Sequence, residues 1–509
     1  MKESWLTQNN TVFAVYAPFG GDPALSAFPP SATNLLDHQL VRSLMDVANL
    51  GVPVVLLMDR YQQDTYLLEF PAGDGSAVRV TSKWKEGMSA PQTLRGFLEF
   101  AQGAHCGRKI VLSVEGHGIA FVPEVDKSKM SKDGRAAGKP GPAWQLDPGG
   151  PSISPAPTQP NATNPALPYI GDVLPYIGDV LPYIGDVLPY IGDVLPGGVM
   201  STWGLGDALR QAIARGVDVL PVIHFNNCFN FSFEVLHTIA PFAEFATGYS
   251  NYNFFSAGAS YASVFQHVVQ GASSGDVARA FAEANHAFLS AEPGHPTIGG
   301  AFALSMAEDV AAAVDALAAR MIEAMNANAA NRDRIQQAIT NAAQYDANFD
   351  FTLEVPDDFT DVRGFAAALM NVFGPAESVH LAAKKLFALT APFKVYGDSG
   401  RPWEQPQLFW NFSGDLAFNI YLPDPLRKGI WDWRAPFYLC NVVSPASGAI
   451  PAQTHVIEFL STTRWVAFIK KFHEKTVWVG MREIIKPVFP LFNPNGGEII
   501  KRWEAQYRK

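Results

Sequence analysis

Cysteine is scarce in this sequence, with three residues in a chain of 509. They are Cys106, Cys228 and Cys440, a set too small and odd in number to form a disulfide framework. Such sparse cysteine is typical of a reducing compartment, so we expect the protein to act in the cytoplasm. The three cysteines are far apart in the sequence and are not grouped as in structural zinc sites, so we expect no metal ligand set.

The sequence also lacks a long basic block and any uninterrupted apolar run of about 18 residues. The formal net charge is −10, which argues against nucleic acid as a partner. The amino-terminal segment has no basic stretch followed by an apolar run, so we expect neither a secretory signal nor a membrane partner. Apolar residues still make up 48% of the chain, enough for two or three packed units.

Short β-rich runs alternate with helical stretches over residues 1–122, which is typical of a parallel α/β sheet. The apolar run KIVLSV over residues 109–114 predicts a central strand, and it ends just before Glu115, Gly116 and His117. Two more strands are predicted over residues 11–16 and 52–58, two helices over 34–49 and 91–102, and a hairpin from strands at 66–70 and 78–81.

Residues 123–199 differ in composition, because they are rich in Pro, Gly, Ser, Asn and Lys and contain four identical copies of PYIGDVL. Proline at every seventh position of the repeats excludes a coiled coil despite the heptad period. We expect a long, disordered and exposed linker that separates two halves of one sheet. A sharper alternative is a linker that is accessible to proteases.

The α/β pattern resumes over residues 200–290, and residues 291–509 form a helical and mixed carboxyl-terminal region. Predicted helices cover residues 205–215, 231–240 and 463–472, predicted strands cover 217–225, 244–249 and 416–422, and an alanine-rich helical stretch covers 306–344. The expected fold class is therefore α/β, with a mostly parallel sheet flanked by helices.

His117 and Cys228 each come just after the carboxyl end of a predicted central strand. These ends share one edge of a parallel sheet, where open α/β sheets place ligands, so we expect the two side chains to meet. A thiol within reach of an imidazole is the arrangement that cysteine peptidases need, together with backbone donors for the oxyanion. Gly118 and Cys228 are the expected sources of those backbone N–H groups.

Other interpretations of these residues are available. A lone cysteine after an apolar strand is often only a small buried residue, but His117 at the matching edge weakens this interpretation of Cys228. Cys106 and Cys440 have no such histidine and are interpreted as packing residues. His224 lies within the apolar strand and is interpreted as a buried core histidine.

Several segments occur in an order that extends beyond any one motif. They are FAVYAPFGGDPAL (13–25), VVLLMDRY (54–61), TLRGFLEFA (93–101), KIVLSVEGHG (109–118), VIHFNNCFNFSFEVLHTIAPFAEFATGYS (222–250), DVRGFAAAL (361–369), NIYLPDP (419–425) and TRWVAFIKKF (463–472). In this order they resemble the clostripain family of cysteine peptidases (family C11), relatives of caspases and gingipains. The resemblance leaves out the insertion over 123–198 and the final segment of the chain.

The resemblance implies a caspase-like α/β core and an endopeptidase that works through His117 and Cys228. It also implies a zymogen that is cut within residues 123–199, with protein or peptide substrates and, we expect, an upstream activating protease. Asn226 and Ser256 are the expected substrate-binding residues. Calcium enters by family analogy alone, and we expect no cofactor.

The sequence departs from the family at Asn226, where clostripain-like enzymes typically carry an Asp that helps to bind Arg or Lys. A neutral amide does not supply that charge attraction, so the preference for basic side chains stays open. Two sets of self-cleavage sites are therefore considered. One is basic (Lys127, Lys129, Lys132, Arg135, Lys139), and the other is acidic (Asp172, Asp179, Asp186, Asp193).

Two other functions use the same residues differently. The first is an inactive caspase-like scaffold that binds protein partners, which the retention of both His117 and Cys228 argues against. The second is an acyltransferase or transpeptidase that proceeds through the same thioester. For the enzyme, we expect a regulated proteolytic cascade in antiviral defence or cell death.

Overall fold

The computed structural model describes most of the chain outside the long insertion. The described residues are 3–19, 35–60, 65–84, 87–116, 118, 120–122, 124–125, 200–227, 230–250, 258, 260–291, 298–345, 359–399, 417–422 and 453–472. The disorder expected of the linker falls on residues that lie outside these ranges, apart from 124–125.

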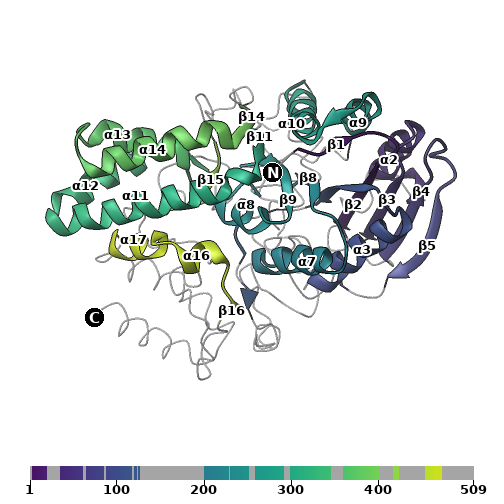
Figure 1. Cartoon of the computed structure of the whole chain (residues 1–509), viewed down its shortest axis with the longest axis horizontal. Helices are drawn as coiled ribbons and strands as arrows, with labels where there is room; N and C mark the ends of the chain where they lie inside the picture. The colour runs from purple at the N-terminus through teal and green to yellow at the C-terminus, as the bar shows by residue number, and fades with distance from the viewer. Residues whose placement is uncertain are drawn as a thin grey trace, which may run out of the picture.

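A nine-stranded sheet forms the centre of the molecule (Figure 1). Its five middle strands, in the order β9-β8-β6-β2-β3, run parallel, and the outer strands β14, β11, β4 and β5 are antiparallel to their neighbours. The strands are β2 (Thr11–Phe19), β3 (Val54–Arg60), β4 (Thr65–Phe70), β5 (Arg79–Trp84), β6 (Lys109–Glu115), β8 (Leu220–Asn226), β9 (Ala243–Tyr249), β11 (Ile298–Ala303) and β14 (Lys394–Ser399).

The parallel centre of the sheet is apolar on both faces, which explains its position. All nine residues of β2 and all seven of β8 are buried. On β6, Leu112 and Val114 point into the core on one face and Val111 into the core on the other. Strands with two apolar faces need helices on both sides, and this requirement favours the expected α/β fold.

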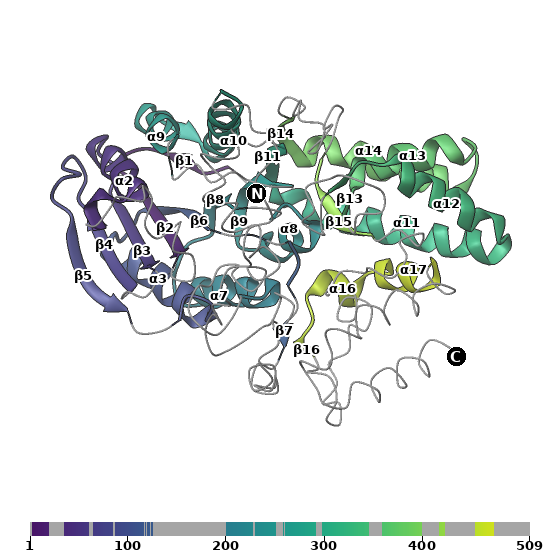
Figure 2. The ribbon, with the colours of Figure 1, turned by 180° about the vertical axis from the view of Figure 1, so that it is seen from behind.

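Helices cover the two faces in two groups (Figure 2). The core on one face includes α3 (Pro91–Ala104), α7 (Thr202–Ala214) and α8 (Phe233–Ile239). The core on the other includes α2 (Gln39–Asn49), α9 (Tyr261–Gln270) and α10 (Ser274–Ala291). The expected sheet flanked by helices is thus confirmed.

The strands β6 and β8 are neighbours in the sheet although the long insertion separates them in sequence. The flanks of the insertion are also joined directly: the Val122 N–H donates to Thr202 Oγ1 (2.9 Å), and the Thr202 N–H donates to the Val122 carbonyl (3.0 Å). A second short pairing joins β7 (Glu124–Val125) to β16 (Gln453–His455). The chain therefore leaves and re-enters the core at neighbouring points.

The carboxyl-terminal region adds a helical layer and further strands of the sheet. The elements are α11 (Ala307–Ala327), α12 (Ala330–Asn341), α13 (Val362–Val372), α14 (Ser378–Phe393), α16 (Glu458–Thr462), α17 (Trp465–Phe472) and a small sheet of β12 (Gln344–Tyr345), β13 (Phe359–Asp361) and β15 (Asn419–Tyr421). Because β11 and β14 extend the central sheet, residues after 290 belong partly to it. The division into the ranges 1–122, 123–199, 200–290 and 291–509 stays a prediction.

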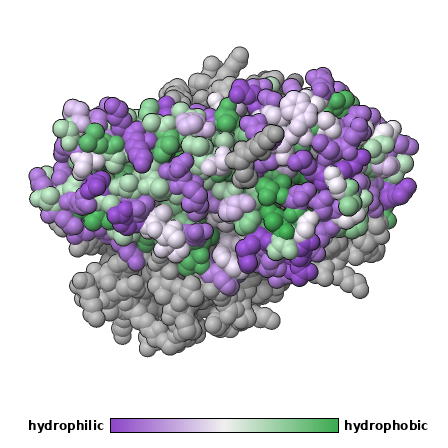
Figure 3. Space-filling model, viewed as in Figure 1, coloured by the Kyte–Doolittle hydropathy of each residue, from purple (hydrophilic) through white to green (hydrophobic). Residues whose placement is uncertain are grey.

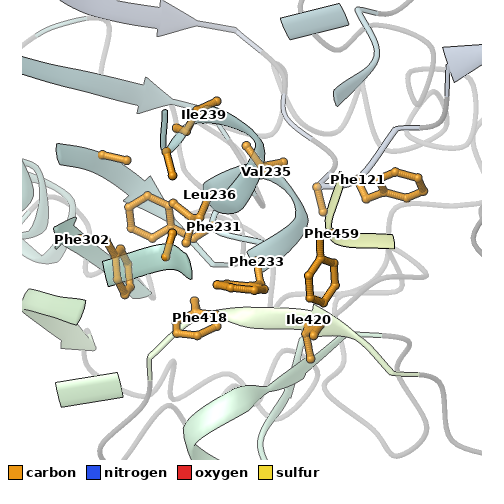
Figure 4. Close-up of a cluster of buried hydrophobic side chains, with 14 of the residues drawn as sticks. Phe121, Phe231, Phe233, Val235, Leu236, Ile239, Phe302, Phe418, Ile420 and Phe459 are labelled. Carbon is orange, nitrogen blue, oxygen red and sulfur yellow. The ribbon is translucent and has the colours of Figure 1, made fainter. Parts of the chain in front are cut away.

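An aromatic cluster joins this region to the central sheet (Figure 4). The ring of Phe233, at the start of α8, lies 5.3 Å from Phe418 and 5.1 Å from Phe459, measured between centroids. Phe231 lies 4.7 Å from Phe302. Buried aromatic side chains contribute strongly to packing, so this cluster fixes the segment that follows residue 228.

Some predicted boundaries differ from the observed ones. The strand predicted from Val217 begins at Leu220, because Gly216 adopts a φ of 102° and the Val217 N–H donates to the Ala212 carbonyl as α7 ends. The alanine-rich stretch divides into α11 and α12 where Asn328 is extended. Glycine with positive φ commonly ends a helix, so residues 217–219, which the sequence assigns to the strand, form the connection between α7 and β8.

The surface seen in Figure 3 mixes hydrophilic and apolar residues without a single dominant apolar area. Large exposed apolar side chains come from separate elements, including Trp5, Val80 and Leu381. Within the described ranges, no helix combines the length and the apolar character that crossing a membrane requires.

Candidate active site

The strands that precede His117 and Cys228 end side by side. In the parallel ladder of β6 and β8, Glu115 is the partner of Asn226, and each is the last residue of its strand. In the sequence His117 and Cys228 come two positions after these strand ends, and both lie outside the described residues. The matching ends are therefore described, whereas the pairing of the two side chains stays a prediction.

The turn after β6 depends on a glycine. Gly116 has a φ of 97°, a conformation that residues with a Cβ rarely adopt. Gly118, one of the expected oxyanion donors, is buried in this turn. Its catalytic role stays a prediction, as does the substrate contact expected of Ser256, which lies outside the described residues.

The turn after β8 is tied to β6 by amide side chains. Asn227 Nδ2 donates to the Val114 carbonyl (3.3 Å), and Asn230 Nδ2 donates to Asn227 Oδ1 (2.6 Å). The Phe231 N–H donates to the Tyr249 carbonyl on β9 (3.0 Å). These bonds attach Asn227 to β6 and Phe231 to β9, the two strands that neighbour β8.

A buried polar cluster lies beneath the two strand ends. The Glu115 carboxylate accepts hydrogen bonds from Ser113 Oγ (2.6 Å), from Asn226 Nδ2 (2.7 Å) and from the Tyr261 hydroxyl. Tyr261 is the first residue of α9, and its hydroxyl also lies 2.9 Å from Ser113 Oγ. All four residues are essentially inaccessible to solvent. The side chain of Asn226, expected to contact substrate, is thus engaged with Glu115.

Burial shifts the ionisation of this cluster. It raises the pKa of Glu115 to about 7, although the hydrogen bonds from Ser113, Tyr261 and Asn226 favour the charged form and oppose the shift. Burial, followed by the adjacent Glu115 charge, raises the pKa of Tyr261 well above its ordinary value. Glu115 is consequently the member of the cluster that titrates near neutral pH.

His224 is a buried structural histidine, as the sequence indicated. Its Nδ1 lies 2.6 Å from Thr247 Oγ1, and its Nε2 lies 3.1 Å from Asn285 Nδ2. Because the Asn285 amide donates, Nε2 is the acceptor and Nδ1 carries the proton. Burial lowers the pKa of His224 to about 3, and the ring stacks on Phe281. The neutral imidazole therefore supports the sheet rather than catalysis.

The other two cysteines and the possible metal ligands remain to be considered. Cys106 is exposed and is not part of a disulfide, so its interpretation as a buried packing residue is wrong, and Cys440 lies outside the described residues. In the part of the chain that the structure describes, no three His, Cys, Asp or Glu side chains gather as a metal site would require. The absence of a cofactor stays a prediction.

Sequence reasoning missed Ser113, Glu115 and Tyr261. A signal was present, because Ser113 is a polar residue inside the apolar run that leads to His117 and Glu115 directly follows that run. Charged residues are rarely fully buried without a role or a partner, so Glu115 was a candidate from its position alone. Tyr261 comes from a distant helix, and its contribution is visible only in the fold.

Comparisons with known proteins agree with this arrangement. The model of the Clostripain family matches residues 196–362, about a third of the chain, and this match confirms the resemblance seen in the sequence. No curated protein matches the chain.

Two solved structures show the same fold. One is the secreted C11 cysteine protease of Bacteroides thetaiotaomicron called iotapain, with 12% identity, a TM-score of 0.50, and coverage of 90% of this chain and 99% of that one. The other is a secreted C11 cysteine protease from the same organism in complex with an irreversible peptide inhibitor, with 12% identity, a TM-score of 0.53 and the same coverage. At this identity the likeness establishes the fold, which both chains share along nearly their whole length.

Proposed function

Because the chain is a cysteine peptidase related to the clostripain family, we propose that His117 and Cys228 form its catalytic dyad. The observation that carries this proposal is the pairing of Glu115 with Asn226 at the ends of the neighbouring parallel strands β6 and β8. Each of the two proposed catalytic residues follows its strand end by two positions.

The proposed chemistry is hydrolysis through an acyl-enzyme. His117 accepts the proton of the Cys228 thiol, and the resulting thiolate attacks the carbonyl carbon of the peptide. The backbone N–H groups of Gly118 and Cys228 stabilise the oxyanion of the tetrahedral intermediate. His117 then donates a proton to the leaving amine, and water hydrolyses the thioester to regenerate the enzyme.

The dyad is tested by labelling the thiols with an iodoacetamide probe and by cleavage of fluorescein-labelled casein. We expect Cys228→Ala to lose both casein cleavage and rapid labelling. Cys106→Ala, which removes an exposed thiol of the same chain, is the matched control and retains both. Casein cleavage by Cys228→Ala at the wild-type rate contradicts the proposal.

We also propose that the protein is a zymogen that is cut within residues 123–199. The flanks of this segment support the proposal, because Val122 is bonded to Thr202 and the Ser201 hydroxyl donates to Glu124. The ladder between β6 and β8 joins the two halves as well. Fragments produced by a cut in the insertion would therefore stay associated.

Mass spectrometry of the purified wild type beside Cys228→Ala tests self-processing. We expect the wild type alone to be cut, and the new amino termini to distinguish the basic sites from the acidic ones. A linker variant without the cut sites is expected to stay inactive, whereas the cleaved wild type is active. Equal activity of this variant and the cleaved enzyme contradicts the zymogen proposal.

The cellular role that we propose is a cytoplasmic protease in a regulated defence or cell-death cascade, activated by another protease at the linker. Support comes from the sequence: the sparse cysteines and the long insertion between the catalytic residues. Limited digestion with proteases of the producing cell tests this role. Resistance of the linker together with constant activity contradicts it.

A further inference from the structure

The Glu115 carboxylate is fully buried, and the proposed chemistry gives it no part. The ring of its partner Tyr261 packs among apolar side chains, with the Phe13 ring 5.1 Å and the Phe281 ring 5.9 Å from the Tyr261 ring. Burying a carboxylate costs solvation free energy, and apolar residues of similar volume are often as stable or more stable. Stability alone therefore does not account for Glu115.

The geometry of Glu115 indicates a different role. Glu115 and Asn226 end the two neighbouring strands, and their side chains continue the connection through the bond from Asn226 Nδ2 to Glu115 Oε2 (2.7 Å). The Tyr261 hydroxyl, from α9, donates to Oε1 of the same carboxylate. Three elements are thus held together directly below the turns that lead to residues 117 and 228.

We propose that Glu115 is a positioning residue of the peptidase: its carboxylate holds Asn226 and the ends of β6 and β8 together, and so fixes the spacing of the turns that carry His117 and Cys228. The inference rests on the proposed function of these two residues. Glu115 acts through Asn226 and the backbone, and takes no part in bond making or bond breaking.

The ionised form of Glu115 is the one that fits its surroundings. A carboxylate only accepts hydrogen bonds, and Ser113, Tyr261 and Asn226 all supply donors. A protonated Glu115 must donate one hydrogen bond, so that one of the facing hydroxyl groups has to turn round and accept. Protonation therefore rearranges the connection between the strand ends.

The other titratable groups around Glu115 in the described structure remain neutral in the physiological range. On α9, the pKa of Tyr261 lies well above its ordinary value, and on β8, burial lowers the pKa of His224 to about 3. From α10, Asn285 and Phe281 face His224 and carry no charge. Since burial raises the pKa of Glu115 to about 7, its titration is expected to appear in the acid limb of activity.

The test compares wild type with Glu115→Gln, which keeps the shape of the side chain and removes its charge. Turnover of internally quenched peptides copied from residues 126–140 and 168–181 is measured from pH 5.5 to 9. We expect kcat to fall roughly tenfold to a hundredfold with little change in KM, because the reacting groups are misplaced while substrate still binds. The inflection that Glu115 contributes near pH 7 is expected to disappear.

Glu244→Gln is the matched control. Glu244 accepts hydrogen bonds from the Ser4 N–H (2.8 Å) and the Ser274 hydroxyl (2.5 Å), near the beginning of β9 and so at the opposite edge of the parallel strands. Like Glu115→Gln, this replacement removes the charge of a carboxylate that accepts several hydrogen bonds. We expect this variant to keep the wild-type pH profile, whatever its stability.

Two further variants keep the inference testable if Glu115→Gln folds poorly. Tyr261→Phe removes one donor and keeps the ring, so the acid limb is expected to move to higher pH. In the double variant Glu115→Asp with Asn226→Gln, the acidic side chain is one methylene group shorter and the amide side chain is one longer. The carboxylate charge and the total length of the hydrogen-bonded pair are retained. This double variant is expected to recover activity that Glu115→Asp alone loses.

The outcomes separate the two proposals. A wild-type protein that has been cut within residues 123–199 and still cleaves neither the two peptides nor casein overturns the proposed function, and the positioning role with it. An active wild type with an equally active Glu115→Gln variant, whose pH profile is unchanged, overturns the positioning role alone. Loss of kcat and of the inflection in Glu115→Gln, with the profile of Glu244→Gln unaltered, supports both.

Discussion

At the scale of single residues, Glu115 lowers the stability of the protein at neutral pH and connects the ends of β6 and β8. The Glu115 carboxylate is buried beside Ser113, Tyr261 and Asn226, and burial raises its pKa from 4.5 to about 7. The native protein therefore keeps this proton over a pH range in which the unfolded chain has already released it. A residue with such a cost at neutral pH is a candidate for function rather than for stability.

The raised pKa of Glu115 predicts how its contribution to stability depends on pH. Below pH 4.5 Glu115 is protonated in both the native and the unfolded protein, and its contribution to the free energy of unfolding is fully present. This contribution is lost as pH rises through about 7. The shift corresponds to about 3 kcal/mol in total. Relative to wild type, Glu115→Gln is therefore expected to gain stability between pH 4.5 and 8, as measured by urea unfolding at several pH values.

Because other groups titrate in both proteins, the difference between the two stability curves is the relevant quantity. Parallel curves for wild type and Glu115→Gln across this pH range would contradict the prediction. A gain in stability with a loss of kcat would show that the charge serves the site at the expense of the fold.

A second prediction at this scale concerns Gly116, whose φ is 97°. A Cβ added to Gly116 would meet its nearest atom, the Pro18 carbonyl oxygen, at 3.6 Å, so backbone strain rather than a clash decides the effect. We expect Gly116→Ala to lose about 1–3 kcal/mol of stability and to lower kcat. Gly216→Ala is the matched control, because Gly216 has a φ of 102° and no atom within 4 Å of an added Cβ.

Thermal unfolding and peptide turnover of both alanine variants check this prediction. The two are expected to lose similar stability, while only Gly116→Ala loses activity, since Gly216 ends α7 away from the strand ends. A similar loss of activity in both variants would assign the effect to general destabilisation.

At the scale of elements, the short helix α8 fixes the segment after residue 228. Phe233, in its first turn, is buried against Phe418 and Phe459, and Glu234 Oε1 accepts from the Tyr421 N–H (3.0 Å). A helix of seven residues is not stable by itself, so these tertiary contacts must hold it.

Phe233→Ala is therefore expected to cost about 3–5 kcal/mol, the usual cost of removing a buried aromatic side chain. Phe288→Ala on α10 is the control, because that ring is 37% exposed, and its loss is expected to be below about 1 kcal/mol. Chemical denaturation of both variants measures the difference. Equal losses would show that the aromatic cluster does not anchor α8.

At the scale of the whole molecule, one sheet is assembled from two halves of the chain. The strands β6 and β8 pair across the insertion, and Val122, Glu124, Ser201 and Thr202 connect its flanks. All of these contacts are made by residues outside 126–199, so we expect the described fold to form without the insertion.

Replacement of residues 126–199 by about eight Gly and Ser residues is expected to leave the fold intact. The replacement makes the loop roughly eight times shorter. This reduces the entropic cost of closing the loop and is expected to raise the free energy of unfolding by about 2 kcal/mol. Urea unfolding and circular dichroism of the shortened protein measure the effect. Loss of cooperative unfolding would show that the insertion contributes to the fold.

The sequence alone indicated the class of the fold, a resemblance to the clostripain family and the positions of the candidate catalytic residues. Apolar runs such as residues 109–114 and 217–225 predicted central strands, because a strand buried on both faces needs apolar residues throughout. The same reasoning predicted that the ends before His117 and Cys228 share one edge. Local periodicity is sufficient to predict the strands, since it depends on neighbouring residues, whereas the family resemblance depends on segments spread along the chain.

Only the tertiary structure decided which strands are neighbours and what lies beneath them. Nothing local to Glu115 indicates that Asn226 is its partner in the ladder or that Tyr261, from a helix 146 positions away, donates to its carboxylate. The antiparallel strands β11 and β14 likewise join the sheet from residues beyond 290. Such contacts arise from the packing of distant segments, and burial by those segments is what moves the pKa of Glu115 towards neutrality.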